Sequence, residues 1–308
     1  MDRKLSPPAS RFTPPPMGPD FVPPKIDPDK YKRKWLDVAY AGQSPSQKMD
    51  IYLPEQGDGP FPVILVVHGG AFMFGSKGEM ISEPMIQGIY HGYAVADINY
   101  RLSGEAIFPA QMYDCKAAVR FLRAHAAEYH LDGSHIAAWG PSAGGHLVAM
   151  LGTSAGVKEL EDLALGNPGE SSAVQAVVDW CGPSENFIQM DIEFQQSDLG
   201  VPDHSAEFSP ESRLLGGKIT EIPERVAFAS PMTYITPAIP PFLIQHGAID
   251  QVVPVQQSIN FAAALAKKAG LEKVILDVLP GVRHHGDPAF ETPENLSRVF
   301  RFLDEHLK

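Results

Sequence analysis

Residues 135–153, HIAAWGPSAGGHLVAMLGT, predict a short buried strand, a tight turn and a helix in immediate succession. The strand runs from His135 to Trp139, and the helix runs from about Ala143 to Thr153. The turn carries the pattern G-x-S-x-G, which between a strand and a helix is typical of a nucleophile elbow. In such an elbow a strained backbone raises the serine oxygen above the edge of the sheet. Ser142 is therefore the candidate nucleophile, with the N-terminus of the helix facing any negative charge that develops.

Strands and helices alternate outward from this stretch, which predicts an α/β fold with a mostly parallel central sheet and helices on both faces. The first two strands have no helix between them, so we expect them to pair as an antiparallel edge. The predicted strands are 35–40, 48–53, 63–67, 93–98, 135–139, 174–180, 242–245 and 273–279. The predicted helices are 112–129, 143–153, 255–269 and 293–307.

Two segments depart from this alternation. Residues 1–30 contain nine prolines and predict an extended N-terminal arm, followed by one catalytic domain over residues 31–308. Residues 183–230 are rich in polar residues, proline and glycine. A long irregular stretch inside a compact domain is usually a binding loop, so this segment is the expected lid insertion.

Charge and hydropathy exclude two classes of partner. The formal net charge of −12 argues against nucleic acid, and no apolar run reaches the length of a membrane span. The oligomeric state is left open. No apolar leader is visible near the N-terminus, which predicts a cytoplasmic protein as the chain is written, or a secreted one if a signal peptide had been removed. We expect Cys115 and Cys181 to be buried thiols.

A second motif, His68-Gly-Gly-Ala-Phe72, follows the predicted strand 63–67 directly. Its glycine pair allows backbone N–H groups to turn toward a substrate oxygen, as in an oxyanion hole. We expect His68 to be structural, hydrogen-bonding this loop, because the base of a triad in this order lies near the C-terminus.

The candidate acid is Asp250, which follows a buried strand and so lies at the same edge of a parallel sheet as Ser142. Asp179 also ends a strand, but it precedes the expected lid and lies only 37 residues after the serine. A triad in the order Ser, Asp, His therefore favours Asp250.

The candidate base lies in the loop that follows strand 273–279, where His284 and His285 are adjacent. Either could reach the edge of the sheet. Metal binding is disfavoured because adjacent histidines rarely hold one ion together and no Cys/His cluster accompanies them. The sequence therefore predicts no metal and no cofactor.

With these segments in order, the chain resembles the α/β-hydrolase superfamily over about residues 35–308. Within it, the chain is similar to hormone-sensitive-lipase-like esterases and to bacterial acetylxylan and feruloyl esterases. The motifs that carry the resemblance are HGGAF at 68–72, NYRL at 99–102, FPAQ at 108–111, GPSAGG at 140–145, HGAID at 246–250 and HHGDPAF at 284–290.

The resemblance implies roles for individual residues. Ser142 resembles the nucleophile, Asp250 the acid, and Gly69, Gly70 and Ala143 the oxyanion donors. The histidine of the family stands in G-x-x-H, which selects His284, and is followed by Gly and an apolar-aromatic pair, which selects His285. We favour His285, with His284 as the alternative, because its downstream match is longer.

The resemblance also implies a carboxylic-ester hydrolase that works through a Ser-His-Asp triad and an acyl-enzyme. Its expected partner is a small-molecule or oligosaccharide ester, carrying an acetyl or hydroxycinnamoyl (feruloyl) group on a plant carbohydrate. Phe72 and Phe108 could line the acyl site or simply pack in the core. The alternatives are an amide hydrolase of aryl-formamidase or peptidase type and a catalytically dead binding protein on the same scaffold.

Overall fold

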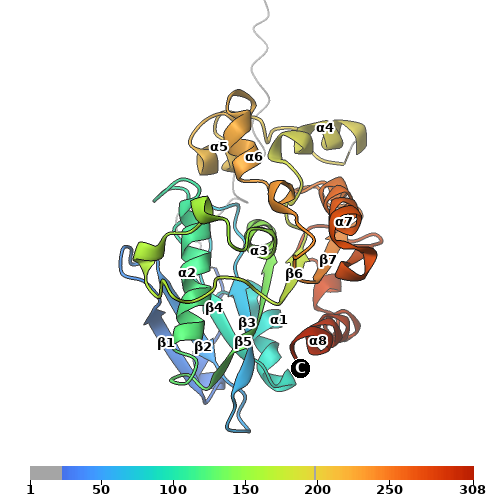
Figure 1. Ribbon diagram of the computed structural model, residues 1–308. Helices are drawn as coiled ribbons and strands as arrows, with labels where there is room; N and C mark the ends of the chain where they lie inside the picture. The colour runs from blue at the N-terminus through green and yellow to red at the C-terminus, as the bar shows by residue number, and fades with distance from the viewer. Residues whose placement is uncertain (1–22, 198) are drawn as a thin grey trace, which may run out of the picture.

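The computed structural model describes residues 23–197 and 199–308, so most of the predicted N-terminal arm lies outside the described residues. These residues contain an eight-stranded sheet with the strand order β1-β2-β4-β3-β5-β6-β7-β8 (Figure 1). β1 and β2 pair antiparallel, as does β2 with β4, and all the other neighbours are parallel. The strands are β1 Lys34–Ala39, β2 Lys48–Tyr52, β3 Phe61–Val67, β4 Ala94–Ile98, β5 Leu131–Pro141, β6 Ala176–Trp180, β7 Phe242–Gly247 and β8 Val274–Leu279. The predicted fold class, including its antiparallel edge, is confirmed.

Three of the four predicted helices match the structure closely. The α-helices are α1 Glu83–Ile86, α2 Ala110–Ala124, α3 Ala143–Thr153, α4 Phe187–Ser197, α5 Pro210–Leu215, α6 Pro223–Phe228, α7 Val255–Ala269 and α8 Pro293–Leu307. α3, α7 and α8 begin and end at the predicted residues. Among the described helices, none combines the length and the hydropathy that a bilayer crossing requires.

One predicted helix is shorter than its apolar pattern. α2 ends at Ala124, although the pattern continues to Tyr129. The Tyr129 ring is still buried, because the turn after α2 places it 6.1 Å from the ring of Phe121 and 5.2 Å from that of Trp35. Tyr129 therefore fits the apolar spacing of a helix although it lies in the turn after the helix.

The sheet separates two hydrophobic clusters. Val63, Leu65 and Val67 of β3 belong to the cluster that contains buried residues of α2, α3 and α7. Ile64 and Val66 belong to the cluster that contains buried residues of α1 and α8. Because successive side chains of a strand point to opposite faces, a continuous apolar run such as β3 is buried on both sides.

The described part of the segment predicted as an irregular lid, residues 183–197 and 199–230, contains three α-helices. α4, α5 and α6 gather beyond one end of the sheet, at the top of Figure 1. The sequence does hold start and stop signals for α5: Ser209 Oγ accepts a hydrogen bond from Ser212 N at 3.1 Å, and Gly216 ends the helix at a φ of 70°. The segment is therefore more regular than expected. α5 and α6 have six residues each, too few to show a clear apolar period.

Candidate active site

Ser142 lies at the turn between β5 and α3, as the motif predicts. Its backbone has φ 55° and ψ −120°, a left-handed conformation that is strained for a residue with a side chain. Its N–H donates to the carbonyl oxygen of Trp180 at 2.7 Å, which fixes the turn to the end of β6. The side chain is 8% exposed. The turn between β5 and α3, together with the hydrogen bond to β6, therefore holds the serine at the C-terminal edge of the sheet.

The glycines of the elbow allow a close approach between backbones. A Cβ atom at Gly144 would lie 2.0 Å from the carbonyl oxygen of Val67, and one at Gly140 would lie 2.6 Å from the same oxygen. No side chain fits at either position. The absence of Cβ atoms lets the start of α3 pack directly against the end of β3.

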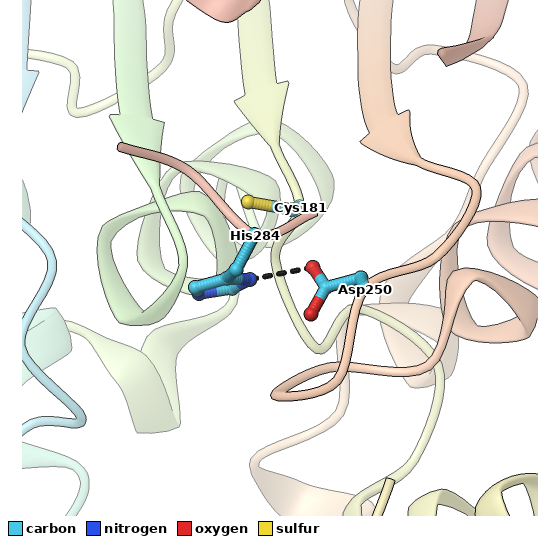
Figure 2. A group of neighbouring side chains, drawn as sticks. All are labelled: Cys181, Asp250 and His284. Carbon is cyan, nitrogen blue, oxygen red and sulfur yellow. Dashed lines mark hydrogen bonds and ion pairs between the residues drawn. The ribbon is translucent and has the colours of Figure 1, made fainter. Parts of the chain in front are cut away.

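Asp250 follows β7 and is 1% exposed. Its Oδ1 accepts hydrogen bonds from the backbone N–H groups of Val252 at 2.7 Å and Val253 at 3.0 Å. Its Oδ2 lies 2.5 Å from Nδ1 of His284 and 3.2 Å from Nε2 of His246. The carboxylate is thus oriented by two amides on one oxygen and presents the other oxygen to an imidazole (Figure 2).

These contacts keep the acid ionised despite its burial. Burial alone raises the pKa of the Asp250 carboxyl, but interaction with the charge of His284 and hydrogen bonds from His246 and His284 together hold that pKa well below its usual range. The sequence motifs assign no role to His246. Its position four residues before Asp250, at the end of the same strand, is the signal that could have found it.

The structure separates the two adjacent histidines. His284 is the one whose Nδ1 bonds Asp250, and its Nε2 is buried without a hydrogen-bond partner among the described residues. The sequence-based preference for His285 therefore differs from the structure at the acid contact. An extra residue in the loop allows two alignments of the motif, and the longer downstream match selected the histidine that does not contact the carboxylate.

His285 lies against the glycine loop instead. A Cβ atom at Gly69 would be 3.5 Å from both Nε2 of His285 and Cβ of Ser142. The ring centroids of His284 and His285 are 4.4 Å apart. Burial, followed by the charge of His284, lowers the pKa of His285 well below its usual value, so this ring is neutral near pH 7.

Two of the three predicted oxyanion donors, Gly69 and Ala143, lie next to Ser142. The same Cβ position places Gly69 beside the serine, and Ala143 is the first residue of α3, where N–H groups have no partner inside the helix. Gly70 has a φ of 117°, and a Cβ atom there would lie 2.3 Å from the carbonyl oxygen of Phe74. Gly70 is therefore required for the turn that brings the Gly69 backbone to the site.

His68 packs against this loop and forms a hydrogen bond with its backbone. It is 1% exposed, its Nδ1 lies 2.7 Å from the carbonyl oxygen of Gly69, and its ring stacks on that of Tyr100 with centroids 4.5 Å apart. Burial lowers the pKa of His68 to about 4. A neutral ring that donates to the loop fits the structural role expected from the sequence.

The two phenylalanines suggested for an acyl site pack inside the protein. Phe72 is 1% exposed, and its ring meets those of His146 and Phe187. Phe108 is 7% exposed and packs edge-on against Phe228, with centroids 5.6 Å apart. Both belong to the core cluster on the α2–α3 face of the sheet. These contacts favour the packing alternative for both rings.

Two further residues near the site have clear positions. Asp179, the rejected candidate acid, accepts hydrogen bonds from Gly182 N at 2.8 Å and Ser184 Oγ at 2.6 Å, so it fixes the loop after β6. Cys181 is buried beside Asp250 and His284 (Figure 2). Burial, followed by the charge of Asp250, raises the pKa of its thiol well above the usual value.

A known protein family covers most of the residues that form this site. The model of the BD-FAE family matches residues 49–265, a range that includes the glycine loop, the elbow and Asp250. The chain belongs to the BD-FAE family of α/β-hydrolase esterases. Residues 284 and 285 lie beyond the matched range, so the family model does not choose between the histidines.

Two solved structures share the fold at more than 30% identity. A truncated carbohydrate esterase from gut microbiota is 34% identical, with a TM-score of 0.80, covering 92% of this chain and 99% of that chain. A bifunctional GH43-CE protein of Bacteroides eggerthii is 33% identical, with a TM-score of 0.79, covering 90% of this chain and 35% of that chain.

Curated relatives include esterases of Mycobacterium tuberculosis. Esterase LipQ is 29% identical over 267 residues, which are 84% of this chain and 59% of the relative. Esterase LipC is 29% identical over 248 residues, which are 80% of this chain and 58% of the relative. The chain therefore spans less than two-thirds of the length of these relatives.

Proposed function

We propose that this protein is a serine carboxylic-ester hydrolase with Ser142 as nucleophile, His284 as base and Asp250 as acid. The observation that carries the proposal is the partly buried contact of 2.5 Å between His284 Nδ1 and Asp250 Oδ2, at the same sheet edge as the strained Ser142. A carboxylate on Nδ1 fixes the tautomer in which Nε2 is free to accept a proton. The unpartnered Nε2 of His284 is the atom that this role requires.

Each step of the proposed reaction has its own group. Ser142 Oγ attacks the ester carbonyl while Nε2 of His284 takes its proton, and Asp250 stabilises the imidazolium that forms. The backbone N–H groups of Gly69 and Ala143 donate to the tetrahedral oxyanion. His284 then returns the proton to the leaving alcohol, and water releases the acid by the reverse sequence. Because these donors belong to the backbone, they need little reorganisation during the reaction.

The substrate that we propose is an acetyl or hydroxycinnamoyl ester of a plant carbohydrate. The names of the two solved relatives, a carbohydrate esterase and a GH43-CE protein, support a carbohydrate alcohol. A surface pocket of about 280 Å³ beside His284 supports it independently, because Gln251, Arg283 and Asp287 line it with hydrogen-bonding groups suited to sugar hydroxyls. We assign the alcohol part of the ester to this pocket.

We further propose that α4, α5 and α6 form the lid of a catalytic domain. They gather beyond one end of the sheet, and Glu185, just before α4, contacts Asn260 of α7 through a hydrogen bond of 2.6 Å. Phe208 in this segment is 69% exposed, which leaves an aromatic surface available to an aromatic acyl group. Phe208→Ala tests this role by comparing feruloyl with acetyl esters.

The function is tested by hydrolysis of p-nitrophenyl acetate, followed by a series of acetylated and feruloylated xylo-oligosaccharides. We expect turnover of the chromogenic ester and higher kcat/KM for a carbohydrate ester than for the matched methyl ester. Equal values for both alcohols would contradict the carbohydrate assignment. Absence of turnover in the wild-type protein, with Ser142→Ala binding the same oligosaccharides equally well, would instead indicate a binding protein.

A further inference from the structure

Three potential metal ligands meet at the end of the sheet. Cys181 follows β6, Asp250 follows β7 and His284 follows β8, and these three strands are neighbours in the sheet. One ligand atom from each lies within 4.8 Å of the other two. Figure 2 shows the three side chains together, with the sulfur of Cys181 above the imidazole that bonds Asp250. The fold thus brings a sulfur, an oxygen and a nitrogen ligand to one point.

This set of donors matches a borderline-soft divalent ion. Zinc binds Cys sulfur at about 2.3 Å and His nitrogen or carboxylate oxygen at about 2.0–2.2 Å, in tetrahedral geometry. Two ligands on such an ion are about 3.3–3.7 Å apart, which follows from those lengths and the tetrahedral angle. The three atoms within 4.8 Å need shifts of about 1 Å, and Nδ1 of His284 must move slightly away from Oδ2 of Asp250.

We propose that Cys181, Asp250 and His284 form an inhibitory site for Zn²⁺ or Cd²⁺. The ion takes the carboxylate and the imidazole out of the triad, so the protein cannot bind the metal and activate Ser142 at the same time. The inhibitory effect rests on the proposed function, whereas the binding site itself does not.

The binding step is balanced by one proton. The thiol of Cys181 loses its proton to solvent as the sulfur–metal bond forms. The proton that Nδ1 of His284 donates to Asp250 moves through solvent to Nε2 of the same ring, so that Nδ1 and the carboxylate can each donate a lone pair to the ion. A water molecule completes four-coordination.

An entry path exists on the His284 side. His284 lines the surface pocket of about 280 Å³ together with Gln251, Val252 and Arg283. Its side chain is 13% exposed, whereas those of Cys181 and Asp250 are buried. An ion therefore reaches the imidazole first and the thiol only after a small movement of the loop that carries His284. We expect inhibition to develop slowly and to be reversed by a chelator.

The test compares substitutions of the two buried cysteines. Cys181→Ser and Cys181→Ala remove the soft ligand, and Cys115→Ser in α2 is the matched control, because Cys115 is also fully buried but lies in a different cluster. Each variant is assayed against its own metal-free rate over a range of Zn²⁺ concentrations. We expect the half-inhibitory concentration to be unchanged in Cys115→Ser and at least about tenfold higher in both Cys181 variants.

Direct binding separates this proposal from the esterase assignment. Cd²⁺ bound to a thiolate gives an ultraviolet charge-transfer band, which we expect in the wild-type protein and in Cys115→Ser but not in Cys181→Ala. The band is expected even if the protein hydrolyses no ester. Equal Zn²⁺ inhibition and an equal Cd²⁺ band in Cys181→Ala would overturn the site. If Cys181→Ala does not fold, the same readouts in Cys181→Ser decide.

Discussion

Nδ1 of His284 lies 2.5 Å from Oδ2 of Asp250, while its sequence neighbour His285 lies against Gly69 on the serine side. The two residues lie in a turn in which Asp287 N donates to the carbonyl oxygen of His284 at 3.1 Å, and their ring centroids are 4.4 Å apart, so the rings are neighbours with different partners. This relationship gives each histidine a separate and testable role.

The first prediction concerns these two histidines. His284→Ala should lower kcat by about four to six orders of magnitude, because triad members act as a unit. His285→Ala should cost about 100-fold or less, through a small displacement of the glycine loop. Steady-state kinetics of both purified variants provides the measurement. The acid limb of the kcat/KM profile should persist in His285→Ala, since the base is still present. A near-inactive His285→Ala beside an active His284→Ala would reverse the assignment.

The nucleophile gives a second prediction. Ser142→Ala should leave only residual catalysis of about 10³–10⁴ over water, supplied by the oxyanion donors and by binding. A serine-directed organophosphonate should add its mass to the wild-type protein at Ser142 alone, as read by peptide mass spectrometry. The control is Ser154, a buried serine at the other end of α3, which should carry no label. Label at any other serine would reject the elbow as the reactive site.

Asp250 allows an isosteric test. In Asp250→Asn the carbonyl oxygen can still accept from Val252 and Val253, but the amide nitrogen then faces Nδ1 of His284 and favours the wrong tautomer. We expect kcat to fall by about 10⁴-fold with the fold preserved. Thermal unfolding of the variant, compared with Asp179→Asn, separates catalytic loss from local unfolding. Activity within tenfold of wild type would mean that Asp250 is not the acid.

A matched pair of glycine substitutions tests the close approach of backbones at the elbow. Gly144→Ala places a methyl group 2.0 Å from the carbonyl oxygen of Val67, so the start of α3 must move away from β3. The cost should be about 1–3 kcal/mol or more of unfolding free energy, together with loss of activity from a displaced serine. Gly104→Ala is the control, because nothing lies within 4 Å of its added Cβ. Chemical denaturation measures both, and equal stability of the two variants would contradict the close approach.

Glu193 in α4 predicts a pH dependence of stability. Burial, with the carboxyl of Glu185 nearby, raises the pKa of Glu193 from 4.5 to about 8. The folded state therefore holds a proton that the unfolded state has released, so unfolding free energy should fall as pH rises from about 4.5 through 8. Glu193→Gln, which keeps the neutral form, should flatten this slope and raise Tm by about 2–4 °C at pH 9.

Thermal scans at pH 5, 7 and 9 measure this effect, with the exposed Glu224→Gln as control. The control should follow the wild-type profile. A slope in Glu193→Gln that matches wild type would show that another group causes the pH dependence.

Local signals were sufficient for much of this protein. The G-x-S-x-G pattern correctly predicted that Ser142 lies at a turn between a strand and a helix, because the close approach that this turn requires is made possible by glycines within the motif itself. The same holds for α3, α7 and α8, whose long apolar periods determine their limits. The loop after β7 likewise located Asp250 at the sheet edge, because parallel strands all end there.

Which of His284 and His285 contacts Asp250 depends on the tertiary structure. Both fit the sequence motif, and a one-residue difference in a loop changes which imidazole meets a carboxylate 34 residues away. The packing of Phe72 and the meeting of Cys181 with Asp250 and His284 are equally long-range. Local sequence determines backbone conformation residue by residue, whereas contacts between separate loops depend on the register and twist of the whole sheet, which are decided when all eight strands pack together.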